Sequence, residues 1–197
     1  MFLKNAVCIS LGHSFRGAIQ PDGKADTAVV QMRDITPERT IDWTACIRTE
    51  IPGRKEPDWL QPGDVLFPTR GSQVYGVTVD ATATQQKAVA APHFHVLRPT
   101  RQDLLPEWLA WWLGQAPCLR HFEQNAQSST QLRNIARTVL ETAPLVIPPL
   151  TQQKTIVALD HAMQREQHLF ERIITQNRQT MTAIADGLAS AHTSRIH

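Results

Sequence analysis

The last quarter of the chain constrains the fold most strongly. Pro148 and Pro149 end whatever precedes them, because proline cannot continue a helix and pushes its predecessor into extended geometry. From Thr151, whose hydroxyl is a potential N-cap, to Ser190 there is no proline and one glycine, Gly187. A helix of about 40 residues would be a rod of roughly 60 Å, much longer than the usual helix of a small domain.

Apolar residues recur along this stretch in steps of three, four and seven, which is the spacing of one helix face. The predicted face comprises Ile156, Leu159, Met163, Phe170, Ile173, Ile174, Met181, Ile184 and Leu188. Polar residues interrupt the face, and one of them, Asn177, is a candidate for setting the register of a helix pair. We interpret the stretch as a coiled-coil arm that dimerises with a partner helix. The alternative is one long amphipathic helix that lies on its own domain.

Residues 1–147 show short strand-like runs separated by turns. We predict strands at 6–11, 29–35, 65–67, 74–79, 88–91, 94–97 and 145–147, and short helices at 104–113, 116–125 and 131–137. The fold class is therefore α+β: a small mixed β-sheet domain with short helices in 1–147, followed by a long helix of coiled-coil type in 148–197. The 197 residues, 42% hydrophobic, suffice for one core domain plus the arm.

The charge and cysteine content exclude few functions. A net charge of +2 does not by itself indicate nucleic acid. Arginine outnumbers lysine, which suits contacts with phosphate or guanine but is equally explained by codon bias. Three cysteines without framework spacing predict a reducing, cytoplasmic location. No apolar run reaches the length of a membrane span, and no signal-peptide pattern is present.

The residues that could support catalysis have simpler explanations. His93 and His95 lie two apart in a predicted strand and could share a metal, but an ordinary pair of sheet histidines is the more frequent case. Asp64 could belong to a nuclease site, yet in a Pro-Gly-Asp turn it more simply caps the backbone. Three tryptophans at helical spacing could stack on bases, although core packing is more usual; they are Trp108, Trp111 and Trp112. We therefore predict no catalytic and no metal-ligating residues.

The order of motifs carries a resemblance to a known family. Residues 63–67 read GDVLF, 70–72 read RGS and 148–153 read PPLTQQ. From about residue 6 to 188, this succession resembles the target-recognition domain and conserved helix of the specificity (S) subunit of type I restriction-modification systems. The family usually has glutamate where this chain has Gln152, which alters the charge at the base of the arm but not its geometry.

The resemblance implies a recognition subunit without catalytic activity. A usual family member has two recognition domains and two such helices in about twice this length, so the chain looks like one half. It would pair through the arm with a second copy or another specificity half and read a bipartite site in double-stranded DNA. The DNA methyltransferase subunits, and possibly a restriction subunit, would be its partners. They would carry S-adenosylmethionine and ATP, and this chain would bind no cofactor.

DNA contacts require side chains that reach phosphates or base edges from loops beside the sheet. The candidates are Gln31, Arg33, Arg54, Lys55, Arg70, Ser72, Gln73, Tyr75, Ser128, Ser129, Thr130 and Arg133. Each could equally be a solvated surface residue. Two other functions stay open: an adaptor or decoy of a defence system that binds a methyltransferase without reading DNA, and a metal-dependent nuclease that uses His93 and His95.

Overall fold

The computed structural model describes residues 1–15, 17–51, 56–71, 74–125 and 133–193 of the chain. It divides into two compact units, Met1–Ala158 and Leu159–His197. The first unit, here called the folded unit, contains all the strands and the first turns of the last helix. The second contains the rest of that helix.

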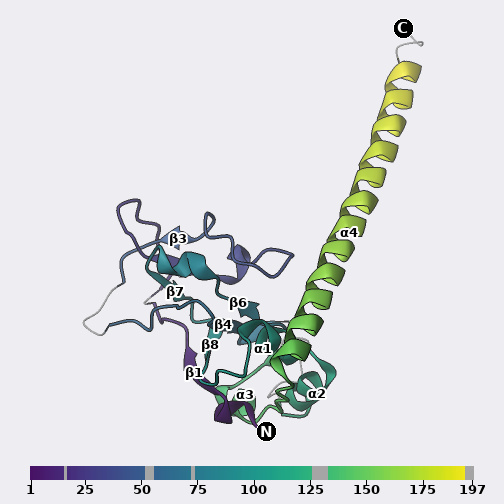
Figure 1. Ribbon diagram of the computed structural model, residues 1–197. Helices are drawn as coiled ribbons and strands as arrows, with labels where there is room; N and C mark the ends of the chain where they lie inside the picture. Colours follow the sequence, from purple (N-terminus) through teal and green to yellow (C-terminus); the bar gives the residue numbers. More distant parts are fainter. Residues whose placement is uncertain (16, 52–55, 72–73, 126–132, 194–197) are drawn as a thin grey trace. The chain divides into compact units, whose positions relative to one another are not determined.

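The central sheet of the folded unit has four antiparallel strands in the order β1-β8-β4-β6 (Figure 1). They are β1 (Val7–Leu11), β4 (Val65–Pro68), β6 (Val77–Thr78) and β8 (Phe94–Pro99). Strand β4 is buried along its whole length, because alternate side chains enter two different cores. Val65 and Phe67 pack among the helices, whereas Leu66 packs toward the second sheet. The four-stranded sheet is therefore the middle layer of the folded unit.

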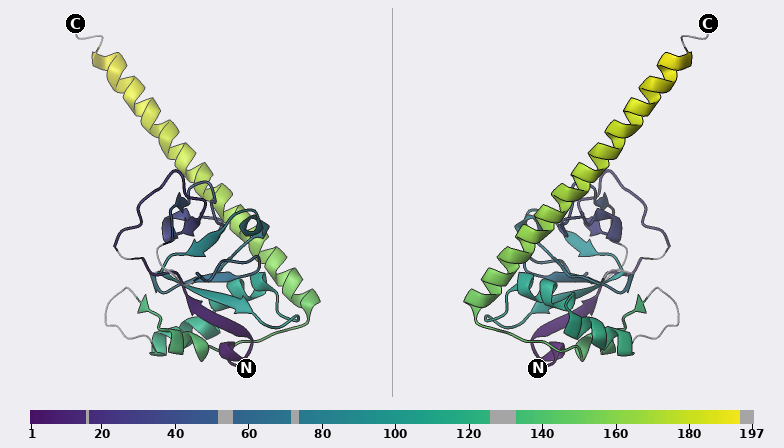
Figure 2. Two further views of the ribbon diagram at one scale, coloured as in Figure 1. Left: turned by 90° about the vertical axis from the view of Figure 1, so that its left-hand side faces the viewer. Right: turned by 90° about the vertical axis from the view of Figure 1, so that its right-hand side faces the viewer.

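The second sheet has the order β3-β2-β7, in which β2 pairs antiparallel with β3 and parallel with β7. Its strands are β2 (Ala28–Val30), β3 (Ile47–Arg48) and β7 (Ala88–Ala90). A two-stranded ladder joins β5 (Arg70–Gly71) to β9 (Arg133–Asn134). The side views in Figure 2 show β1, in purple, beside the teal strands of the middle sheet.

Helices α1 (Pro106–Leu113), α2 (Ala116–Asn125) and α3 (Arg137–Glu141) pack on the other face of the middle sheet. The last helix is α4 (Leu150–Thr193), of which Ile156 and Val157 pack against the same core. The 3-10 turns are η1 (Leu3–Asn5), η2 (Met32–Asp34) and η3 (Ala81–Thr84). Pro106 is the first residue of α1, where its missing N–H is not needed. Even α4, the longest of the described helices, lacks the apolar length that a bilayer crossing requires.

The predicted α+β class is confirmed, and several predicted elements need correction. The strand predicted at 29–35 ends at Val30, because the Asp34 carboxylate accepts the Gln31 backbone N–H at 2.8 Å and closes η2. Strand 74–79 is reduced to β6, and 145–147 forms no strand. In place of the helix predicted at 131–137, the described residues form β9 and then α3. Helix α4 begins at Leu150, so Thr151 lies inside it and does not cap it.

Two of the candidate catalytic residues, Asp64 and His95, make structural contacts. The Asp64 carboxylate accepts the Gln61 N–H at 2.8 Å, as predicted for a backbone cap, and also pairs with Arg98 at 2.7 Å. His93 lies in the turn before β8 and shares no strand face with His95, so that prediction was wrong. Buried His95 contacts the Ile135 carbonyl through Nε2 at 2.9 Å. Among the described residues, no three potential ligands gather into a metal site.

Candidate nucleic-acid interface

Several strands of the folded unit end at one edge. Strands β2 and β7 run parallel with Val30 opposite Ala90, so the chain leaves both strands in the same direction. Strand β8 begins just after the turn that follows β7, and its antiparallel pairing places Phe94 opposite Pro68, the last residue of β4. The ends of β2, β4 and β7 therefore meet, and we call the segments that follow them the carboxyl edge.

The carboxyl edge brings together four of the predicted DNA-contacting residues. Gln31 and Arg33 follow β2, and exposed Arg70 follows β4. Tyr75 precedes β6, which runs antiparallel to β4 and so begins near the end of β4. The remaining predicted positions lie outside the described residues: Arg54, Lys55, Ser72, Gln73, Ser128, Ser129, Thr130 and the side chain of Arg133.

A cleft of about 340 Å³ lies at this edge. Its lining comprises Phe15, Gly17, Ala18, Ile19, Gln31, Arg33, Ile47, Ala91, Pro92 and His93. The side chain of Arg33 is 60% exposed, so its guanidinium can reach an external group. The Gln31 side chain accepts the Asp34 N–H, while its Nε2 has no hydrogen-bond partner among the described residues. That Nε2 atom is buried, so the group available to an external ligand is the Arg33 guanidinium, which beside apolar walls matches the acceptors of base edges and phosphates.

The buried residue Asp34 stabilises the turn that carries Gln31 and Arg33. Its buried carboxylate accepts the Gln31 N–H and lies 3.6 Å from the Arg33 guanidinium. Burial raises the pKa of Asp34, although the hydrogen bond from Gln31 and the charge of Arg33 act in the opposite direction. The carboxylate thus fixes the 3-10 turn that presents the Arg33 side chain, while offering little negative surface to a phosphate.

The loop that follows β1 also starts at the carboxyl edge. Gly12 donates its N–H to the Phe94 carbonyl at 2.9 Å, and His13 donates to the Ala90 carbonyl at 2.7 Å. A Cβ at Gly12 would lie only 2.0 Å from the Ala91 carbonyl oxygen, so only glycine permits this approach. The close packing directs the loop to the cleft, where Phe15 forms part of the wall.

Some edge residues were not predicted from the sequence. His93 was considered only as a metal ligand, yet it lines the cleft beside Arg33. The position of His93 shortly after the buried run 88–91 was the sequence signal that could have placed it at this edge. Arg39 was also missed: its guanidinium lies 5.2 Å from the centre of the Tyr75 ring, and its φ of 57° is in the left-handed region. No sequence pattern predicted the contact between Arg39 and Tyr75.

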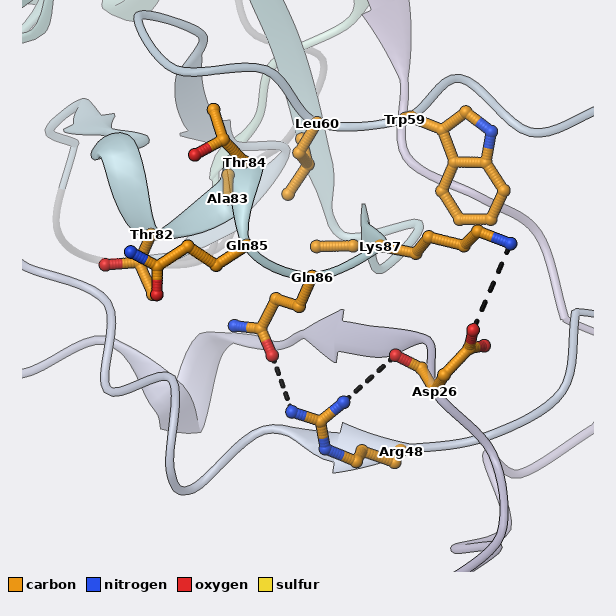
Figure 3. Close-up of a pocket in the computed structure, with 11 residues that line it drawn as sticks. Asp26, Arg48, Trp59, Leu60, Thr82, Ala83, Thr84, Gln85, Gln86 and Lys87 are labelled. Carbon is orange, nitrogen blue, oxygen red and sulfur yellow. Dashed lines mark hydrogen bonds and ion pairs between the residues drawn. The ribbon is translucent and has the colours of Figure 1, made fainter.

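A larger hollow of about 730 Å³ lies at the opposite edge, where β2 and β7 begin (Figure 3). Its cationic side chains are engaged internally. Arg48 donates to the Asp26 carbonyl at 3.0 Å and to the Gln86 side chain at 2.6 Å. The Lys87 ammonium lies 4.0 Å from the Asp26 carboxylate and 5.8 Å from the centre of the Trp59 ring. These contacts join η3 to β2 and β3, so this hollow is less suited than the carboxyl edge to an external phosphate.

The second unit presents the apolar face predicted for the arm. Phe170 is 57% exposed, and comparable exposure is found for Leu159, Met163, Ile173, Ile174, Met181, Ile184 and Leu188. Asn177 is exposed on the same helix. Ile156, by contrast, is half-buried against the core of the folded unit. A row of large apolar side chains with such exposure is typical of a surface that meets another protein.

Comparison with known proteins gives matches at the level of structure. No family model and no curated protein matches the sequence. One solved chain, from a study described as "Structural basis underlying complex assembly and conformational transition of the type I R-M system", aligns over 87% of this chain with a TM-score of 0.58 and 19% identity. The HsdS subunit from Thermoanaerobacter tengcongensis aligns over 84% with a TM-score of 0.53 and 20% identity.

These matches define the class of fold. Small sheets, short helices and a long C-terminal helix are arranged as in these type I restriction-modification structures. The resemblance to specificity subunits seen in the sequence is therefore confirmed for the fold, the HsdS subunit being one such protein. The chain spans 39% of the first solved chain and 36% of the HsdS subunit.

Proposed function

We propose that this chain is a DNA-sequence recognition subunit of a type I restriction-modification system. The observation that carries the proposal is the fold, which is similar to that of an HsdS subunit over 84% of the chain. The carboxyl edge supports it, because there the fold brings Gln31, Arg33, Arg70 and Tyr75 to one surface. The chain itself would bind DNA and catalyse nothing.

The arm would pair two recognition units. Its exposed apolar face from Leu159 to Leu188 needs a partner helix, and a second copy or another specificity half would supply one. A two-fold pair reads a two-part site with a separation set by geometry.

The chemistry would belong to the partners. DNA methyltransferase subunits, with or without a restriction subunit, would bind the paired arms and carry S-adenosylmethionine and ATP. The recognition subunit would position them on the bipartite site. A cytoplasmic location would follow from this role.

The test is DNA binding by the purified chain. A selection from random double-stranded DNA should enrich a two-part site, and its affinity should fall steeply with salt. Arg33→Ala and Arg70→Ala should each weaken binding, by about 1–3 kcal/mol at one base position if the arginine reads a base, or equally for all sequences if it contacts phosphate. Arg120→Ala, which removes the same charge from an exposed position of α2, is the matched control. Unchanged binding in both edge variants would refute the assignment of the edge.

The second candidate is an adaptor that binds a methyltransferase without reading DNA. The low net charge of +2 favours it. It predicts a stable complex with a methyltransferase subunit, but no enriched DNA site and no salt-dependent DNA affinity. The selection described above therefore separates the two functions.

A further inference from the structure

The segment that leads into α4 is bound by a ladder of side-chain donors. Residues 144–148, here called the strap, belong to none of the strands, although Pro144 forms an isolated antiparallel bridge with Phe2. Three alternate carbonyls of the strap accept hydrogen bonds. Trp112 donates its indole N–H to Pro144 at 2.8 Å, and Trp108 donates to Val146 at 2.9 Å. Gln153 Nε2 donates to the third carbonyl, that of Pro148, at 2.7 Å.

This spacing of hydrogen bonds follows from the two-residue period of an extended chain and from the helical period of α1. In an extended chain successive carbonyls point to opposite sides, so every second one faces α1. On α1, Trp108 and Trp112 are one turn apart and lie on the same face. An indole N–H is a donor only and needs an acceptor when buried. A slip of the strap by one residue would turn all three carbonyls away from their donors.

Gln153 completes the ladder from within α4. Its side chain is fully buried, which is unusual for glutamine. The Oε1 atom accepts the Leu105 N–H at 2.9 Å, and Nε2 also donates to the Asp103 carbonyl at 2.7 Å. With the bond to Pro148, one amide joins the first turn of α4 to the strap and to the segment before α1.

The other side of the strap is bound to the start of the chain. The Leu145 N–H donates to the Met1 carbonyl at 2.8 Å, and the Leu3 N–H donates to the Ala143 carbonyl at 2.9 Å. The strap is thus hydrogen-bonded on both sides. These contacts hold the strap in one register, and α4 begins directly after the strap and Pro149.

We infer that Trp108, Trp112 and Gln153 are positioning residues that set the spacing between the two DNA half-sites. The inference rests on the proposed function. A shift of one residue at the start of a helix displaces its residues by about 1.5 Å and turns its faces by roughly 100°. The apolar face of the arm would then meet its partner at a different angle, and the separation of the paired recognition units would change.

The first test compares spacer preference. Trp112→Phe and Gln153→Met remove ladder donors without adding charge, and Trp111→Phe is the matched control, because no described hydrogen bond joins Trp111 to the strap. On DNAs that carry the selected half-sites with different spacers, the wild-type chain and the control should prefer one spacer length. In both ladder variants that preference should fall roughly tenfold, with base preferences within each half-site retained. An unchanged spacer preference would overturn the inference.

The second test needs no DNA, so it separates this inference from the proposed function. In a Cys8→Ser background, spin labels are attached at Gln85→Cys in the folded unit and Gln176→Cys in α4, and labelled protein is diluted in an excess of unlabelled protein. Cys46 and Cys118 stay unlabelled because burial raises the pKa of each thiol to about 12. The distance distribution should broaden in Trp112→Phe and Gln153→Met but not in Trp111→Phe. Equal distributions in all variants would overturn the inference even if DNA recognition is confirmed.

Discussion

The apolar face of α4 gives the sharpest quantitative prediction. Phe170 and Ile174 are 57% and 50% exposed, so about half of each side chain would be newly buried in a helix pair. Since complete burial of such a side chain stabilises by about 1.5–3 kcal/mol, each contributes roughly 1 kcal/mol per copy. Phe170→Asp should therefore cost about 2 kcal/mol per dimer, and the double variant Phe170→Asp, Ile174→Asp about 4 kcal/mol. These costs correspond to a weakening of roughly 30-fold and on the order of a thousandfold.

Light scattering over a range of concentrations measures the mass of the protein in solution and so the strength of dimerisation. The wild-type chain should have the mass of a dimer, and the double variant should be a monomer at the same concentration. Gln179→Asp, which adds the same charge at an exposed position of α4, should remain a dimer. A double variant that stays dimeric would refute the assigned face. A wild-type monomer with unchanged mass in every variant would refute self-pairing and favour either a helix that lies on its own domain or a different protein partner.

Three further predictions concern the folded unit. Gly12→Ala should lower the free energy of unfolding by several kcal/mol, since its Cβ would collide with the Ala91 carbonyl, whereas Gly23→Ala, with open space around it, should have little effect in a urea titration. Burial lowers the pKa of His95 below its ordinary 6.5, so the unfolded chain binds more protons; stability should be complete above pH 6.5 and decline as the pH falls below it. His95→Gln, which can still donate to the Ile135 carbonyl, should reduce that decline, and an identical pH profile would contradict the assignment. Of the three cysteines only Cys8 is exposed, so a thiol reagent should modify one thiol in the native chain and three in denaturant; a second fast native thiol would show that Cys46 or Cys118 is accessible.

Local sequence was sufficient to predict most of the helices and strands. The runs that became β1, β4, β7 and β8 are apolar and bounded by turn residues, and α1 and α2 each follow a helix-start signal or a helical apolar pattern. The end of β2 could not be predicted in this way. VVQMRDI has strand propensity throughout, but the Asp34 carboxylate turns back to the Gln31 N–H and ends the strand. Asp34 is buried there, and the residue pattern of this stretch does not predict that burial.

The proximity of the candidate DNA-contacting residues depends on the register of strand pairing. The sequence indicated which side chains could contact DNA, but not that Gln31, Arg33 and Arg70 follow strands that end together. That proximity arises because Val30 pairs with Ala90 and Pro68 with Phe94. A change of register in either pairing would separate them, and no local pattern encodes it.

The sequence by itself determined the long helix, its apolar face and the α+β class, because helical periodicity and proline breaks act over short distances along the chain. Only the tertiary structure decided that Trp108 and Trp112 bind the strap and that Gln153 is the buried residue joining it to α4. A donor's partner depends on which backbone passes it in space, and sequence spacing carries no information about residues brought together by folding.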